Sequence, residues 1–210
     1  MLFDLDGTLA DSTEAHIAAW LKSLEYLGIS RSRELLTRLM GLSSIDIARK
    51  LLPPHMAERA EELADIKDGI FMKEMVRLAK PVLGAREVVL LAKRLGMKCG
   101  VVSMNPRRVI IQILDTIGLL ELMDVIVGTE DVERGKPAPD PILEACMQLG
   151  VNPREAVYIG DSVYDVQAAT AAGAVSVLIG SPRAGVRPHF AVGSLKELIH
   201  LLGRLKDCEH

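Results

Sequence analysis

Short apolar runs that alternate with helix patterns constrain the fold of this chain more than any other feature. The runs cover residues 1–3, 98–103, 125–128, 156–161 and 174–179, and the last of these is the final strand that we expect. Helices follow the later runs, with helix starts at Asn105 and Ser162 and a stop at Gly173. Because strands that are apolar throughout pack between two layers of helices, the pattern predicts an α/β protein with a Rossmann-like, doubly wound parallel sheet.

Residues 11–78 interrupt this alternation. Asp11-Ser12-Thr13-Glu14 has the order of a capping box, so we expect a helix from there to about residue 28. Further helices are expected over 31–40, up to Pro53-Pro54, and over 55–78, with no convincing strand among them. This order predicts a core domain of residues 1–11 and 80–210 and a helical cap domain of residues 12–79 inserted after the first strand.

The composition restricts the partners of the protein. A formal net charge of -3 and a pI of about 6.0 give no basic footprint for nucleic acid, and only 3% of the residues are aromatic. Three widely spaced cysteines predict neither a zinc site nor a disulfide framework. We see no signal peptide and no membrane-spanning run, so the expected location is the cytoplasm, without a membrane partner. The oligomeric state is not readable from the sequence.

Two carboxylates, Asp4 and Asp6, follow the first apolar run within the stretch Asp4-Leu5-Asp6-Gly7-Thr8. Gly7 allows the chain to turn there, so both side chains can converge on one small volume. Carboxylates this close repel one another unless a cation or a proton lies between them. The pair is therefore a candidate for binding a hard metal ion, for acid–base chemistry, or for both, while a plain Asp-Gly turn is the simpler alternative.

Ser103 and Asp161 fall at further strand ends, where ligands bind in open α/β sheets. Lys136 and Asp165 are expected at the same edge of the sheet. Four carboxylates at one edge suit Mg²⁺, and a hydroxyl, a lysine and the N–H groups of a helix opening at Asn105 suit a phosphate. A carboxylate near Mg²⁺ can attack phosphorus and form an acyl phosphate.

Each residue also has a simpler explanation when it is taken alone. Asn105 can be only a helix cap, and Ser103 can simply end a strand. Lys136 can be a solvated loop charge, and Ser162 with Asp165 can form a capping box without a metal. Only the joint pattern argues against these explanations.

The joint pattern resembles the four motifs of the haloacid dehalogenase superfamily, in the same order and over nearly the whole chain. The resemblance is to its phosphoglycolate phosphatase and β-phosphoglucomutase-like subgroup, whose members carry a helical cap. It implies that Asp4 is the nucleophile and Asp6 the general acid and base. It also implies a phosphate site and a Mg²⁺ site. The phosphate site consists of Ser103, Met104, Asn105 and Lys136, and the Mg²⁺ site of Asp4, the backbone of Asp6, Asp161 and Asp165.

Members of the family usually have a few residues before Leu2, so a shortened first strand is expected.

The resemblance also bears on the reaction. An aspartate at the position of Asp6 indicates phosphoryl transfer, since the dehalogenases themselves lack it. His16 implies coupling of cap closure to Asp6, although ordinary packing of His16 and Trp20 on one helix face is the alternative. Mutases of the subgroup carry an arginine where this chain has Ser44, and nothing in the sequence marks Lys67 as special.

We therefore predict a Mg²⁺-dependent phosphatase acting on a small phosphorylated metabolite, a phosphoglycolate- or sugar-phosphate-like monoester, through an aspartyl-phosphate intermediate. A β-phosphoglucomutase-like mutase is the first alternative. A non-catalytic binding or regulatory protein on the same fold is the second.

Overall fold

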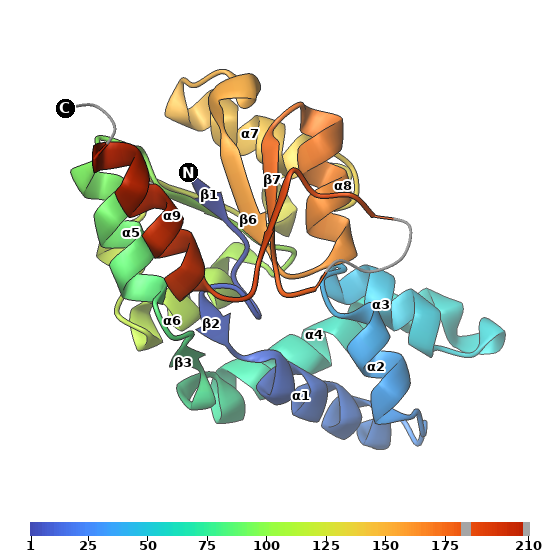
Figure 1. Ribbon diagram of the computed structural model, residues 1–210. Coiled ribbons are helices and arrows are strands. Elements are labelled where there is room, and N and C mark those ends of the chain that lie inside the picture. The colour runs from blue at the N-terminus through green and yellow to red at the C-terminus, as the bar shows by residue number, and fades with distance from the viewer. Residues whose placement is uncertain (182–185, 208–210) are drawn as a thin grey trace.

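The computed structural model describes residues 1–181 and 186–207 (Figure 1). Six parallel strands form the central sheet in the order β5-β4-β1-β6-β7-β8. The strands are β1 (Leu2–Phe3), β4 (Gly100–Val102), β5 (Val125–Val127), β6 (Val157–Gly160), β7 (Val175–Ile179) and β8 (Phe190–Val192). β1 lies in the middle, where Leu2 pairs with Gly100 on one side and with Tyr158 on the other. The predicted parallel α/β sheet is confirmed.

Helices cover both faces of the sheet, because alternate side chains of each strand point to opposite faces. Phe3 and its neighbours on β4 and β6 pack against α5 (Ala85–Arg94), α6 (Arg107–Thr116) and α9 (Leu195–Asp207). Leu2, Val102 and Tyr158 face the opposite layer. That layer consists of α7 (Asp140–Leu149) and α8 (Val163–Ala172), which Figure 1 shows on the far side of the strands from α5 and α9.

Three short strands were not predicted. β8 follows β7 in the sheet, but it has only three residues, two of them exposed, so it lacks an apolar run. β2 (Ala10–Asp11) and β3 (Lys80–Pro81) form a separate antiparallel pair. Two residues per strand carry no periodicity, so only the folded chain reveals that this pair joins the helices of residues 13–78 to the sheet.

The helices of residues 13–78, which we call the helical insert, lie beside the sheet (Figure 1). The insert contains α1 (Thr13–Tyr26), α2 (Arg33–Leu39), α3 (Ser44–Leu51), a 3-10 helix (Pro54–Arg59), α4 (Ala60–Ile70), a π-helical turn (Phe71–Met75) and a 3-10 turn (Val76–Leu78). It has an apolar cluster of its own around Trp20.

The prediction of one continuous helix over 55–78 is wrong. The segment begins as a 3-10 helix at Pro54 and widens into a π-turn at Phe71. The buried Phe71 ring lies stacked on His16, with 3.9 Å between the ring centroids and 6° between the planes. Among the described residues, no helix is both long and apolar enough to cross a membrane.

Candidate active site

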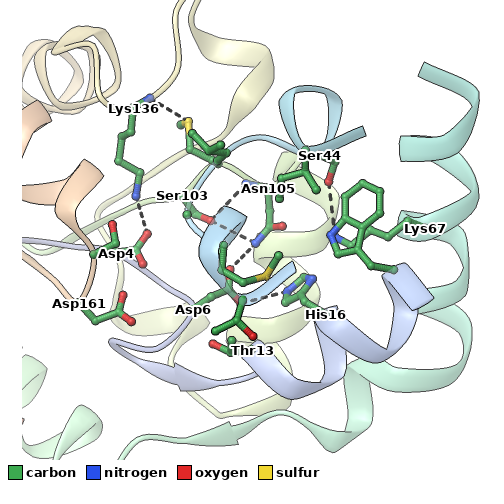
Figure 2. Close-up of a pocket in the computed structure, with 18 residues that line it drawn as sticks. Asp4, Asp6, Thr13, His16, Ser44, Lys67, Ser103, Asn105, Lys136 and Asp161 are labelled. Atoms are coloured by element: carbon green, nitrogen blue, oxygen red, sulfur yellow. Dashed lines mark hydrogen bonds and ion pairs between the residues drawn. The ribbon is translucent and has the colours of Figure 1, made fainter. Parts of the chain in front are cut away.

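A cavity of about 150 Å³ lies between the carboxyl edge of the sheet and the helical insert (Figure 2). Nine of the ten predicted site residues line it, namely Asp4, Asp6, His16, Ser44, Ser103, Met104, Asn105, Lys136 and Asp161. Asp165, the tenth, is 1% exposed and lies behind Lys136, whose amine it contacts. The cavity opens to solvent, and its size suits a small metabolite.

Lys136 joins the carboxylates at the sheet edge. Its Nζ lies 2.7 Å from Asp4 Oδ1 and 2.7 Å from Asp165 Oδ1, and only 3% of the residue is exposed. Lys136 is therefore a buried ion-pair partner in this structure, and the simpler alternative of a solvated loop charge is wrong. Figure 2 shows the long side chain reaching down to Asp4.

The pKa values of Lys136 and Asp4 depend strongly on the charges of their neighbours. Burial would lower the pKa of Lys136, but the Asp165 and Asp4 carboxylates outweigh burial and raise it well above its usual value. Burial raises the pKa of Asp4, and the nearby charges of Asp165 and Asp161 raise it further against the effect of Lys136. The lysine alone does not balance the carboxylates gathered here.

Three of those carboxylates could hold a metal ion together. Asp4, Asp161 and Asp165 each offer an oxygen within 4.8 Å of the others. Burial, followed by the charge on Asp165, raises the pKa of Asp161 to about 7 against the effect of Lys136. A hard divalent cation with oxygen ligands fits this donor set.

Glycines let the loops approach closely enough to form the cluster. Gly7 has a φ of 82°, and a Cβ there would lie 2.3 Å from Asp161 Oδ2. A Cβ on Gly160 would lie 2.4 Å from Asp165 Cγ. Any side chain at these two positions would push the carboxylates apart.

Asp165 has two roles. The capping box with Ser162 exists, because Asp165 Oδ2 accepts from the Ser162 backbone at 3.0 Å and from Ser162 Oγ at 2.6 Å. The other oxygen, Oδ1, accepts from Lys136. The cap therefore holds Asp165 so that it can orient the lysine.

Asp6 has different surroundings, which include three side-chain hydrogen-bond donors. Ser12 Oγ donates to its Oδ1, His16 Nε2 lies 3.1 Å from the same oxygen, and the Asn105 amide donates to Oδ2 at 2.5 Å. Burial would raise the pKa of Asp6, but the contacts with His16 and Ser12 outweigh it and lower the pKa to about 2. Asp6 is therefore ionised in this structure.

Two helix starts differ from their prediction for this reason. The predicted capping box of Asp11 and Glu14 is absent: Ser12, not Asp11, precedes α1, and its hydroxyl donates to Asp6 instead of capping the helix. Pro106, not Asn105, precedes the first residue of α6, and the Asn105 side chain turns toward Asp6 and Ser103. In both cases a buried carboxylate competes with the helix end for the donor, and the charge-assisted hydrogen bond is stronger.

The expected phosphate site differs in detail from its prediction. The first backbone N–H of α6, on Arg107, donates to the Glu130 carboxylate, and the Asn105 N–H donates to Ser103 Oγ. The helix start therefore does not offer these two groups to a ligand. The buried Met104 sulfur accepts from the Lys136 backbone N–H at 3.2 Å, which fixes the loop that carries the lysine.

His16 reaches Asp6 from α1, as the resemblance implied (Figure 2). Burial, with the nearby charge of Lys67, lowers the pKa of His16, so the ring is neutral near pH 7. A neutral ring donates to an ionised carboxylate only through a protonated Nε2, which fixes the tautomer. His16 also packs on Phe71, so the hydrogen bond and the packing alternative are both present.

Sequence reasoning missed Lys67, a cation that lines the cavity from the insert. It is 2% exposed, and its Nζ lies 2.9 Å from Asp68 Oδ1 and 3.4 Å from Ser44 Oγ. The amine also lies over the rings of Trp20 and Phe71, 5.4 and 5.6 Å from their centroids. The helical spacing could have indicated its burial, because Lys67 and Asp68 fall on the buried stripe of α4 formed by residues 60, 63 and 64.

Comparison with known proteins agrees with this geometry. The family model described as "Haloacid dehalogenase-like hydrolase" matches residues 1–179. Pyrophosphatase PpaX of Halalkalibacterium halodurans is 30% identical over 210 residues, covering 97% of this chain and 96% of that protein. Validoxylamine A 7'-phosphate phosphatase of Streptomyces hygroscopicus subsp. limoneus is 32% identical over 177 residues, covering 82% and 81%.

A solved structure shares the fold over almost its full length. β-Phosphoglucomutase from Clostridium difficile superposes with a TM-score of 0.86 at 22% identity, covering 99% of this chain and 97% of that one. The match of the family model to residues 1–179, together with the relatives, shows that the chain belongs to the haloacid dehalogenase-like hydrolases.

Proposed function

We propose that the protein is a Mg²⁺-dependent phosphatase that hydrolyses a small phosphorylated metabolite through an aspartyl phosphate on Asp4. The observation that carries this proposal is the position of Asp4. Its carboxylate lines the cavity, lies 2.7 Å from the buried Lys136 amine, and shares a possible metal site with Asp161. The phosphatase names of two relatives that match the chain support the same reaction.

The residues that would hold Mg²⁺ are Asp4, the backbone carbonyl of Asp6, and Asp161, with Asp165 supporting them. Both Asp165 oxygens accept hydrogen bonds from other groups, which favours a supporting role over direct coordination. When bound, Mg²⁺ offsets the negative charge of the phosphoryl group that is being transferred.

In the first step, a carboxylate oxygen of Asp4 forms a bond to phosphorus, and the bond from phosphorus to the leaving oxygen breaks. Asp6 gives its proton to that leaving oxygen. Asp6 is ionised in the structure, but a phosphoryl group bound at Ser103, near the charge of Lys136, would add negative charge beside Asp6 and raise its pKa. The substrate itself thus promotes the protonated form that this step requires.

In the second step, Asp6 accepts a proton from a water molecule whose oxygen attacks the phosphorus of the aspartyl phosphate. The bond between phosphorus and Asp4 breaks, and inorganic phosphate leaves. His16, Ser12 and Asn105 stabilise the ionised form of Asp6 that this step needs. Lys136 offsets charge in both steps.

We further propose that residues 12–79 act as a cap domain on a core of residues 1–11 and 80–210, and that closure of the cap excludes bulk water. Lys67 gives the insert a cation at the cavity, where it would bind an anionic group on the leaving side of the substrate. The absence of an arginine at Ser44 therefore does not by itself exclude a substrate with a second anion, and only product analysis separates hydrolysis from a mutase reaction.

Replacement of each aspartate tests the mechanism. Asp4→Asn should reduce hydrolysis of p-nitrophenyl phosphate on the order of 10⁴-fold or more, as loss of a nucleophile does in other hydrolases. Asp6→Asn should slow both release of nitrophenol and hydrolysis of the phosphoenzyme. Asp115→Asn, at an exposed position on α6, is the control and should retain full activity. Activity that survives Asp4→Asn, or that needs no metal, would refute the proposal.

A screen of phosphorylated metabolites would then identify the substrate class. Pyrophosphate, phosphoglycolate and hexose phosphates differ in size and in the charge of the leaving group, so their relative kcat/KM values report on the cavity and on Lys67. Conversion of a hexose phosphate into its isomer, without release of phosphate, would favour the mutase instead.

A further inference from the structure

Tyr158 is a buried polar residue at the site to which the proposed mechanism assigns no role. It lies on β6 and is 1% exposed, with its ring in the apolar layer beneath α7 and α8. Tyr158 does not belong to the residues that line the cavity. Its hydroxyl nevertheless lies 3.1 Å from Lys136 Nζ, so it contacts the lysine from the side away from the cavity.

The hydrogen-bonding groups around the phenol determine its role. The hydroxyl has one proton, and two acceptors surround it, the Val102 carbonyl at 3.0 Å and Asp165 Oδ1 at 3.2 Å. An ammonium group can only donate. Tyr158 therefore donates to one of those acceptors and accepts from Lys136.

The same count applies to the lysine, which has three protons. Its three shortest contacts are Asp4 Oδ1 and Asp165 Oδ1, each at 2.7 Å, and the Tyr158 hydroxyl at 3.1 Å. One neutral acceptor and two carboxylates thus use every N–H of the amine. The Val102 carbonyl, at 3.5 Å, is more distant and already lies near the phenol.

We propose that Tyr158 is a positioning residue for the phosphoryl transfer, because it accepts the third N–H of Lys136 and so directs the amine at Asp4. This inference rests on the proposed function. During the reaction the charge on Asp4 passes to the phosphoryl group, and the pull of Asp4 on the amine weakens. Tyr158 and Asp165 remain in place and keep the amine at the same point through both steps.

Tyr158→Phe tests the inference, since it removes only the hydroxyl and keeps the ring that packs under the helices. We expect kcat to fall about 10- to 100-fold, the loss that follows removal of one hydrogen bond to a charged group. KM should change by less than about threefold, because Tyr158 does not contact the substrate. Circular dichroism checks that the variant is folded. A kcat of the folded variant within twofold of the wild-type value would overturn the inference.

Ser176→Ala is the matched control. Ser176 pairs with Tyr158 in the neighbouring strand, is also 1% exposed, and also loses a buried hydrogen bond, which it makes with His189. It makes no contact with Lys136 among the described residues, so its kcat should be unchanged. An equal loss of kcat in both variants would show a general effect on the sheet and would contradict the inference.

A double-mutant cycle with Lys136→Met separates the two proposals. If Tyr158 acts through Lys136, adding Tyr158→Phe to Lys136→Met should cause no further loss of kcat. An additional 10-fold loss would mean that Tyr158 acts independently. Full activity in Lys136→Met would instead refute the proposed function itself. Lys136→Gln replaces Lys136→Met in the cycle should the methionine variant fail to fold.

Discussion

Two buried lysines face the same cavity from opposite sides, and their surroundings differ. Lys136 comes from the sheet edge and contacts two carboxylates and a phenol, which use all three of its protons. Lys67 comes from the helical insert and contacts one carboxylate and one hydroxyl, with two aromatic rings beside it (Figure 2). Lys136, in the loop before α7, is held by three groups, whereas Lys67 has fewer and longer hydrogen bonds.

This difference suits two different roles, charge compensation for Lys136 and substrate selection for Lys67. A group that must offset charge in every turnover should not depend on which substrate is bound, and the contacts of Lys136 come from the core alone. A group that selects the substrate should form its best contact only with the ligand. Lys67, whose contact with Ser44 is as long as 3.4 Å, can exchange that contact for an anion. The four predictions below test this comparison.

Lys136→Met should have the largest effect. Loss of one charge-stabilising group in an active site costs on the order of 10²- to 10³-fold in kcat. The loss should be the same for p-nitrophenyl phosphate and for every metabolite substrate, since all share the phosphoryl group. Steady-state kinetics with two substrates measure this, and Lys196→Met, at an exposed position on α9, is the control. A loss confined to one substrate would reverse the roles of the two lysines.

Lys67→Met should have a smaller and selective effect. A hydrogen bond to a charged group is worth about 1.5–3 kcal/mol, so kcat/KM for pyrophosphate or phosphoglycolate should fall about 10- to 100-fold. For p-nitrophenyl phosphate, whose leaving group has no second ionised acid, the change should stay within about threefold. Lys73→Met, in the exposed part of the same segment, provides the control. Equal losses for all substrates would remove the proposed selectivity.

The pH dependence of metal binding should come from Asp161 at the sheet edge and not from the helical insert. The pKa of Asp161 is raised to about 7, so below that pH its carboxyl holds a proton that a metal ion must displace. The Mg²⁺ concentration for half-maximal activity should therefore rise about tenfold per pH unit below pH 7 and level off above it.

The measurement is a Mg²⁺ titration of activity at several pH values between 5.5 and 8.5. Lys67→Met should keep this dependence, since the amine of Lys67 contacts Ser44 and Asp68 and none of the three carboxylates of the metal site. A half-maximal concentration that does not change with pH would mean that Asp161 does not exchange a proton for the metal.

Arg108→Ala should have the smallest effect. Arg108 on α6 lies 3.7 Å from Asp65 and 3.9 Å from Asp68, and its side chain is 56% exposed. Exposed ion pairs contribute about 1 kcal/mol or less, so the free energy of unfolding should fall by no more than that and kcat should stay within twofold. Urea unfolding at low and high salt tests this. A loss of more than about 2 kcal/mol would mean that Arg108 helps to hold Asp68 on Lys67.

Much of the site on the sheet side was predictable from the sequence. Asp4, Asp6, Ser103 and Asp161 each follow an apolar run, and parallel strands bring their carboxyl ends to one edge, so their convergence follows from the order of elements. Asp165 was expected at the same edge, and the capping box with Ser162, which was the alternative explanation, is also present. These residues needed only local pattern and topology.

The helix ends and the strands of two or three residues were less predictable. Ser12 and Asn105 are good caps by residue type, yet both hydroxyl and amide turn to Asp6, which is distant from Asn105 in the sequence. Rules for helix caps count only neighbouring residues, so they fail wherever a buried charge from another part of the chain offers a stronger hydrogen bond.

The sequence by itself determined the parallel sheet, the place of the helical insert and the acidic edge, because strand periodicity and motif order are local properties of the chain. Only the tertiary structure showed that a lysine of the insert lines the cavity and that a buried phenol contacts Lys136. Lys67 reaches the cavity because α4 packs its buried stripe on α1 and α3, and Tyr158 on β6 contacts Lys136 because the loop before α7 brings the lysine to the edge of the sheet. Burial of a lysine or a phenol depends on such packing, and neither residue type alone predicts it.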